Sequence, residues 1–251
     1  YFVTVCTALK SRAEIFSMNG TIFPVEAIWS NFTDVWKLAP MSNYMMNSIV
    51  IAGGSTLLAM VCGIPAAYAL SRMKFKGQTA FLGFVIVSQM FAPVVLLIGI
   101  YKVMMAFHLT NSIIGLIFIN AAFNQAFAIW LLRGTFLSIS PEMEQAATID
   151  GCSPLGTFWR VVFPLVKPAV MTFSIINTFW YWNDYLMTQM LLTRKALRTI
   201  QLSMQALFNE AFYAWDTALS ALTLSLIPML IVFTLLQKNV LEGVAAGAVK
   251  G

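Results

Sequence analysis

Long apolar runs that recur along this chain constrain its fold more than any other feature. A helix needs about 20 consecutive apolar residues to cross the roughly 30 Å hydrocarbon core of a bilayer. Several runs reach that length, and shorter polar or basic segments separate them. We therefore predict an all-α, polytopic membrane helix bundle with complete spans at residues 46–70, 79–107, 112–132, 166–192 and 213–236.

The overall composition agrees with a membrane-embedded chain. Of the 251 residues, 59% are hydrophobic and 10% are charged, whereas soluble domains are about half apolar and about a quarter charged. The net charge of +5 is scattered among the apolar runs, so basic cytoplasmic loops explain it better than nucleic-acid binding. Three widely spaced cysteines and a single histidine indicate neither a disulfide framework nor a metal site.

The N-terminal part combines an apolar stub with a polar segment. Residues 1–9 cross less than half of the hydrocarbon core at about 1.5 Å per residue, so we interpret them as the end of a span whose beginning is missing. With this stub we count about six spans, the first one truncated, in a single domain that covers residues 1–251. Residues 10–43 are predicted to form an external loop. It contains an amphipathic helix that packs on the bundle, lies at the interface or contacts a partner, indicated by the spacing of Val25, Ile28, Trp29, Phe32, Val35 and Trp36.

A tight basic cluster sets the orientation of the predicted bundle. Arg72, Lys74 and Lys76 crowd the short loop after the first complete span, and Lys and Arg in short loops favour the cytoplasmic side of a membrane. Counting crossings from this loop places residues 10–43 outside and residues 133–164 in the cytoplasm. The chain is therefore predicted to be a multi-pass protein of the cytoplasmic membrane.

The second predicted cytoplasmic segment carries the punctuation of two short helices with a sharp corner between them. Ser140 can cap a first helix that opens with Pro141, and Gly151 can supply the left-handed residue that ends it. Ser153 repeats the start signal for a second helix. That helix is expected to end at Pro164, because a proline ring removes a hydrogen bond and clashes with the preceding turn.

The spacing within this segment resembles the signature of a known family. Gln-Ala-Ala at residues 145–147 is followed after three residues by Gly151, and after nine more by Val-Val-Phe-Pro at residues 161–164. This resembles the cytoplasmic signature of membrane subunits of bacterial ABC importers, which reads Glu-Ala-Ala, three residues, Gly, nine residues, Ile, any residue, Leu-Pro. Asp150 before the glycine and the pair Trp182 and Asn183 resemble the carbohydrate-uptake branch, which is similar to maltose-type permease subunits.

The resemblance implies an ABC importer type I permease fold in the bacterial inner membrane, with a cytoplasmic coupling helix seated in a cleft of an ATPase subunit. The small Ala146 and Ala147 would let that subunit approach closely, with Met143 as an apolar knob on the same face. The motif acid falls on Gln145, and Glu144 could supply its ionic contact from the neighbouring position. The alternative is a helix pair that merely closes the bundle. The implied ATPase-coupling residues are Met143, Glu144, Gln145, Ala146, Ala147, Asp150, Gly151 and Pro164.

The resemblance also implies the partners of the chain. They would be a second homologous permease subunit, two ATP-binding cassette subunits, an extracytoplasmic solute-binding protein and membrane lipid. The sequence contains no Gly-rich loop that ends in Gly-Lys-Ser or Gly-Lys-Thr. The chain is therefore expected to be a non-catalytic subunit that binds no cofactor, with ATP and Mg on the partner ATPase subunits.

Polar residues recur along the span predicted at residues 166–192. Ser174, Asn177, Tyr181 and Thr188 share one helical face with Asp184, because they follow at intervals of three and four. Polar groups are costly against lipid, so this face is expected to line a wet pathway. The aromatic rings around the acid suit sugars, whose rings have apolar faces. The predicted substrate-pathway residues are Asn120, Asn124, Asn177, Tyr181, Trp182, Asp184 and Tyr185.

Alternatives stand beside these predictions. Trp180 and Trp182 also suit an interfacial aromatic belt, and Asn120, Asn124 and Gln89 also suit hydrogen bonds between helices. For the whole chain we predict a subunit of an ATP-driven importer of sugars or oligosaccharides, with a secondary transporter or channel subunit as the alternative. The lack of an internal repeat and the scarcity of intramembrane charge count against that alternative. The absence of His-Glu-x-x-His and Gly-x-Ser-x-Gly motifs counts against a membrane-embedded enzyme.

Overall fold

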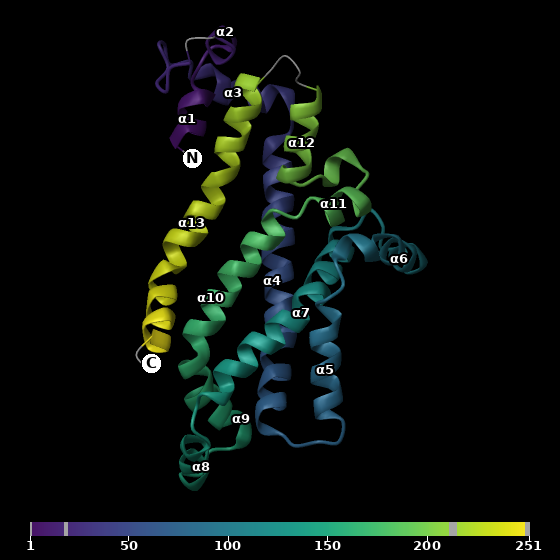
Figure 1. Ribbon diagram of the computed structural model, residues 1–251, viewed down its shortest axis with the longest axis vertical. Coiled ribbons are helices and arrows are strands. Elements are labelled where there is room, and N and C mark those ends of the chain that lie inside the picture. Colours follow the sequence, from purple (N-terminus) through teal and green to yellow (C-terminus); the bar gives the residue numbers. More distant parts are fainter. Residues whose placement is uncertain (1, 18–19, 211–214, 249–251) are drawn as a thin grey trace.

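The computed structural model describes residues 2–17, 20–210 and 215–248, and every regular element in these ranges is a helix. Figure 1 shows a long bundle with short helices gathered at both ends. The upper end in this view carries α1 (Phe2–Ala8), α2 (Arg12–Ile15), α3 (Ser30–Leu38) and α12 (Ile200–Glu210). The lower end carries α8 (Pro141–Ile149) and α9 (Pro154–Thr157).

Within the described residues, four helical stretches are long and apolar enough to cross a membrane. They are α4 (Met41–Arg72), α7 (Ile113–Leu137), the stretch Pro154–Trp182, and the part Trp215–Leu235 of α13 (Trp215–Ala248). The bent pair α5 (Gln78–Ser88) and α6 (Pro93–Ala106) makes a fifth if it is one span. The predicted all-α membrane bundle is therefore confirmed. The count of about six spans is not confirmed, since α1 has only 7 residues, and the predicted start of the last span at residue 213 lies outside the described residues.

The predicted span 79–107 is not one straight helix, because α5 and α6 are bent relative to each other by 105°. Pro93 opens α6, and the preceding Ala92 adopts an extended backbone with φ −62° and ψ 131°. A proline disfavours the helical conformation of the residue before it, which accounts for the break. The chain after α5 stays beside α7, where the Gln89 side chain donates a hydrogen bond to the Phe123 carbonyl at 3.3 Å.

The helix break expected at Pro164 is absent. Instead, α9, a π-helical turn η1 (Phe158–Val162) and α10 (Phe163–Trp182) run on as one helical stretch. In the π turn the Phe163 N–H donates to the carbonyl of Phe158, five residues earlier. This wider turn lets the helix continue into a residue that cannot donate a backbone hydrogen bond. The corner at Gly151 therefore connects α8 to a continuous helix and not to a second short one.

The span predicted at residues 166–192 is shorter than expected, because α10 ends at Trp182. A separate short helix, α11 (Leu186–Leu191), follows, and then the 3₁₀ turn η2 (Lys195–Leu197). Asp184 accepts a hydrogen bond from the Met187 N–H at 3.2 Å and another from the Thr188 hydroxyl at 3.2 Å. A side chain that satisfies free N–H groups at a helix start favours a new helix there. The predicted polar stripe from Ser174 to Thr188 is therefore not one helical face.

The predicted external segment, residues 10–43, is partly helical. It contains α2, α3 and the first residues of α4. The amphipathic helix exists but is shorter than the predicted pattern, because Val25 and Trp29 precede α3 and are 84% and 70% exposed. Val35 is fully buried where α3 packs on α13.

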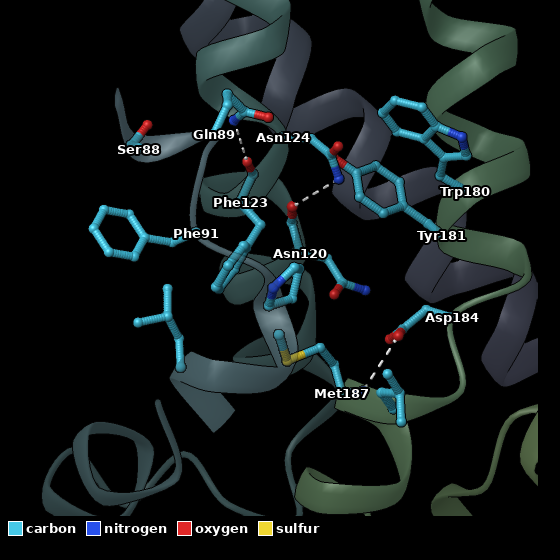
Figure 2. A pocket seen from close by; sticks show the side chains of 13 residues that line it. Ser88, Gln89, Phe91, Asn120, Phe123, Asn124, Trp180, Tyr181, Asp184 and Met187 are labelled. Atoms are coloured by element: carbon cyan, nitrogen blue, oxygen red, sulfur yellow. Dashed lines mark hydrogen bonds between the residues drawn. The ribbon is translucent and has the colours of Figure 1, made fainter. Parts of the chain in front are cut away.

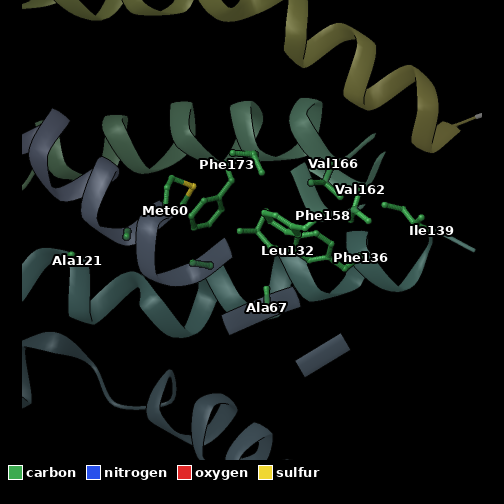
Figure 3. Close-up of a cluster of buried hydrophobic side chains, with 13 residues drawn as sticks. Met60, Ala67, Ala121, Leu132, Phe136, Ile139, Phe158, Val162, Val166 and Phe173 are labelled. Atoms are coloured by element: carbon green, nitrogen blue, oxygen red, sulfur yellow. The ribbon is translucent and has the colours of Figure 1, made fainter. Parts of the chain in front are cut away.

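A cluster of buried apolar side chains joins α4, α7, η1 and α10 (Figure 3). Small residues let the helices approach closely: a Cβ atom added to Gly63 of α4 would lie 3.1 Å from the Cβ of Ala128 in α7. Close packing of this kind is a main source of helix association in lipid, where the hydrophobic effect between helices is weak. Phe136 and Phe173 are fully buried in the cluster. The packed helices α4, α7 and α10 thus hold in place the cavity and the helix α8 that are described below.

Candidate functional site

A cavity of about 410 Å³ opens where α5 breaks from α6 and where α10 ends (Figure 2). Its walls come from the α5–α6 break, the middle of α7, the end of α10 and the start of α11. Four of the predicted pathway residues lie in this wall, and two that had alternative interpretations, Gln89 and Trp180, join them. The lining residues are Ser88, Gln89, Phe91, Pro93, Leu96, Asn120, Phe123, Asn124, Trp180, Tyr181, Asp184, Leu186 and Met187.

Three of the predicted pathway residues do not line this cavity. Asn177 is fully buried, and its amide donates to the Phe173 carbonyl at 3.1 Å within α10. Trp182 is buried in a second apolar cluster, where it packs with residues of α3, α4, α12 and α13. Tyr185 is partly buried between α10 and α11. The helix end at Trp182 explains only the position of Tyr185, because the chain changes direction after it. Asn177 and Trp182 lie within α10, on sides of the helix that pack inside the bundle.

The sequence prediction missed most of the α5–α6 wall. Ser88 and Phe91 border the break and enter the lining together with Leu96 of α6. The signal for them was Pro93, which marks a break but does not indicate which side chains the break exposes. Phe123 lies one turn after Asn120 and directly before Asn124 on α7, so the spacing of the two asparagines was a usable signal.

Several polar atoms in this region have no partner. The Tyr181 hydroxyl, the Asn120 amide nitrogen and the Asn177 amide oxygen are buried and make no hydrogen bond within the described residues. Figure 2 shows the Asn124 and Tyr181 side chains directed towards each other across the cavity wall. A buried polar group without a partner costs about 1–3 kcal/mol. Water or a hydroxyl-bearing ligand in the cavity would remove that cost from Asn120 and Tyr181.

Asp184 is the charged residue of the cavity wall. One carboxylate oxygen accepts from the Met187 N–H, and the other accepts from the Thr188 hydroxyl. These local bonds supply the partner that an acid in this environment needs. A carboxylate has about four acceptor sites, so both oxygens keep capacity for a further donor from the cavity.

The second candidate region is α8, whose predicted caps are confirmed. The Ser140 hydroxyl accepts from the Glu142 N–H at 3.4 Å, and Pro141 is the first helical residue. At the other end Gly151 has a positive φ of 83°. The Cys152 N–H donates to the Ala147 carbonyl at 3.0 Å, and the Gly151 N–H donates to the Thr148 carbonyl at 3.0 Å. This pair of bonds is the Schellman motif, which ends a helix at a left-handed glycine.

The predicted coupling residues of α8 lie on two different faces of the helix. Gln145 and Ala146 are exposed, and Met143 is 46% exposed. Ala147 is only 7% exposed and faces the bundle, so it is not a free surface for a partner. Glu144 also turns inward and pairs with Arg72 of α4, at 2.6 Å between Oε1 and Nε. The carboxylate of Glu144, which could have supplied the ionic contact of the motif acid, is thus engaged within the chain.

The remaining residues of the predicted coupling set lie at the ends of this region. Asp150 and Gly151 are exposed at the corner after α8. Pro164 is exposed in the first turn of α10, beyond the π turn. A hollow borders α8 and is lined by Tyr68, Glu144, Gln145, Thr148, Ile149, Pro154 and Thr157.

Comparison with known proteins agrees with this architecture. The model of the family described as "Binding-protein-dependent transport system inner membrane component" matches residues 59–245. The chain belongs to this family. The family match covers α7, α8, α10 and the part of α4 from residue 59 onwards, so it includes the cavity wall and the capped helix. The predicted resemblance to permease subunits and the predicted inner-membrane location are both confirmed.

Individual members of the family extend over nearly the whole chain. The chain is 33% identical to the probable ABC transporter permease protein YurM of Bacillus subtilis strain 168, over 98% of this chain and 82% of that protein. It is 31% identical to the melibiose/raffinose/stachyose import permease protein MelC of the same organism, over 100% of this chain and 91% of MelC. A chain in a crystal structure of a bacterial ABC transporter for import of the acidic polysaccharide alginate matches with a TM-score of 0.80 at 23% identity. That match covers 94% of this chain and 88% of the other, and it supports the permease fold.

Proposed function

We propose that this inner-membrane component is one of two permease subunits of an ATP-driven importer of sugars or oligosaccharides. A second homologous permease subunit completes the pathway, two ATP-binding cassette subunits carry ATP and Mg, and an extracytoplasmic binding protein delivers the solute. The dependence on a binding protein is the property that names the family. The relative MelC, with its import of melibiose, raffinose and stachyose, supports a carbohydrate solute.

The chemistry of the cavity supports the same class of solute. The unpaired Tyr181 hydroxyl and Asn120 amide can each form a hydrogen bond to a hydroxyl group, and Asp184 can accept one. Trp180 and Phe123 add flat apolar surfaces to the wall. A sugar has hydroxyl edges and apolar ring faces, so it complements this mixture. Selectivity among sugars is shared with the binding protein.

The observation that carries the coupling role is the position of α8. This short helix is capped at both ends, lies at one end of the bundle beside the Arg72 end of α4, and exposes Gln145 and Ala146. In the proposed assembly that end is cytoplasmic, because the basic cluster after α4 lies there. The exposed Met143 adds an adaptable apolar contact for the ATPase subunit.

Reconstitution tests this proposal. The chain is incorporated into proteoliposomes with its permease partner, ATPase subunits and binding protein, and ATP hydrolysis is measured across a panel of sugars. We expect one or a few sugars to stimulate hydrolysis and to be imported. Uptake by this chain alone, driven by an ion gradient and indifferent to ATP, would instead identify a secondary transporter or channel subunit.

A matched pair of variants tests the surface of α8. Ala146→Trp places bulk on an exposed position, so the fold is retained while seating against the ATPase is blocked. We expect a several-fold loss of binding-protein-stimulated ATP hydrolysis in Ala146→Trp and little change in Ala146→Ser, which keeps the small volume. Equal activity of the two variants would remove this surface from the interface.

A further inference from the structure

The end of α4 is fastened to α8 by a group of side-chain contacts that involves Tyr68, Arg72 and Glu144, here called the α4–α8 clasp. Arg72 Nε donates to Glu144 Oε1 at 2.6 Å, and the Tyr68 hydroxyl donates to Glu144 Oε2 at 2.9 Å. Both oxygens of the carboxylate are thus held by residues of α4. A carboxylate with a donor on each oxygen has a fixed orientation as well as a fixed distance.

The clasp also holds the chain on either side of α8. Arg72 Nη2 donates to the Ile139 carbonyl at 2.9 Å, just before α8 begins. The Tyr68 ring makes edge contacts with Phe136 at 5.5 Å and with Phe158 at 4.9 Å between ring centroids. These two rings belong to the end of α7 and to the π turn before α10. The clasp therefore gathers α7, α8 and the start of α10 around the last turn of α4.

The surroundings of the ion pair favour a persistent contact. The side chains of Arg72 and Glu144 are only 15% and 16% exposed, whereas those of the surface pair Lys37 and Asp34 are 76% and 43% exposed. Water and salt screen the α4–α8 pair less than such a surface pair. Arg72 is also the last residue of α4, where a cation interacts favourably with the helix dipole. Removing either charge leaves the other partly buried without its partner.

We propose that Arg72 and Glu144 are positioning residues that make α8 and α4 move as one body. This inference rests on the proposed contact of α8 with an ATPase subunit. Covalent continuity alone would pass a displacement of α8 through the corner and the π turn into α10. The clasp adds a direct path to α4. A hydrogen bond of 3.0 Å between the hydroxyl oxygens of Thr56 and Thr178 in turn links α4 to α10. A displacement of α8 would then move α4 and α10 together.

Double-mutant analysis of the assembled transporter tests the proposal. Sugar import per ATP hydrolysed is compared for wild type, Arg72→Met, Glu144→Gln and the double variant. Residues in direct contact show coupling, so we expect each single variant to lose about tenfold in this ratio and the double variant to lose no more than either one. The charge-swapped variant Arg72→Glu/Glu144→Arg should regain part of the loss, which a general destabilisation would not allow. Asp34→Asn, which breaks the exposed ion pair at the other end of the bundle, is the matched control.

Spin-label distances supply a readout that does not depend on transport. Labels are placed at Glu142 on α8 and at Met73 after α4, in a background without native cysteines. In the full complex, the distance between them should be the same without nucleotide and with ATP and vanadate. In Glu144→Gln the distribution should broaden or shift when nucleotide binds.

Different results would contradict the clasp and the proposed contact of α8 with the ATPase. Independent losses in the two single variants, together with identical label distances in wild type and Glu144→Gln, would overturn the clasp while leaving the contact of α8 with the ATPase intact. Absence of any nucleotide-dependent change between Glu142 and a label on the ATPase subunit, in wild type as in the variants, would instead overturn the proposed contact of α8.

Discussion

Removal of the Tyr181 hydroxyl should weaken sugar transport without lowering the stability of the protein. Tyr181 is 5% exposed, its ring packs in the apolar cluster that contains Trp182, and its hydroxyl makes no hydrogen bond within the described residues. Tyr181→Phe keeps the ring and deletes only the unpaired group. In most proteins the loss of a buried hydroxyl costs stability, but here we expect the opposite sign.

The expected magnitude follows from the pairing state of the hydroxyl. A buried polar group without a partner costs about 1–3 kcal/mol, and a satisfied hydrogen bond contributes about 0.5–1.5 kcal/mol to stability. Water that enters the cavity offsets part of the cost. The free energy of unfolding of Tyr181→Phe should therefore stay the same or rise by about 1 kcal/mol. If the hydroxyl binds the sugar, its loss should weaken apparent affinity by about twofold to tenfold, which corresponds to one hydrogen bond.

The assay combines unfolding of the purified complex in detergent with sugar uptake in proteoliposomes. Tyr44→Phe is the control, because Tyr44 is 3% exposed in the same cluster and does not line the cavity. It should leave uptake unchanged. A fall in stability of Tyr181→Phe by 1 kcal/mol or more, with uptake unchanged, would show that the hydroxyl has a structural partner and would refute its role in the pathway.

Three glycines give further expected outcomes, each measured as the free energy of unfolding in detergent. Gly115→Ala should destabilise the protein by more than about 1 kcal/mol, because its Cβ would lie 2.5 Å from the backbone oxygen of Leu109. Gly134→Ala, in the same helix with no atom within 4 Å of its Cβ, should stabilise by about 0.5–1 kcal/mol. Gly151→Ala should cost about 1–2 kcal/mol, since the site has open space but a left-handed φ of 83°; equal stability of wild type and Gly151→Ala would contradict this.

Local signals in the sequence predicted local structure well. Ser140, Pro141 and Gly151 each act on backbone groups within a few residues, so their effect does not depend on the rest of the fold. The structure accordingly shows the start of α8 and its Schellman end where the sequence places them. The long spans are predictable for a related reason. Their length and apolar character reflect the thickness of the bilayer and not a particular set of neighbours.

Features that depend on tertiary contacts could not be predicted in the same way. The π turn lets the helix continue through Pro164, and the helix end at Trp182 decides the direction of the side chains that follow it. Asp184 could be expected to have a partner, but its partners are N–H and hydroxyl groups a few residues ahead that become available only because α10 ends. Helical periodicity was therefore extended across a boundary that the sequence does not mark.

Positions 144 and 145 are neighbours in the sequence, but their side chains face different surfaces of α8. Consecutive residues of an α-helix point about 100° apart, so Glu144 and Gln145 cannot serve the same surface. Glu144 lies on the side that faces α4, where Arg72 and Tyr68 satisfy both of its oxygens. Gln145 takes the exposed side, which is the side proposed to meet the ATPase. At the proposed contact with the ATPase, the position of the motif acid is therefore held by a neutral amide that can still donate and accept hydrogen bonds. The adjacent acid, Glu144, pairs with Arg72 and Tyr68 within the chain.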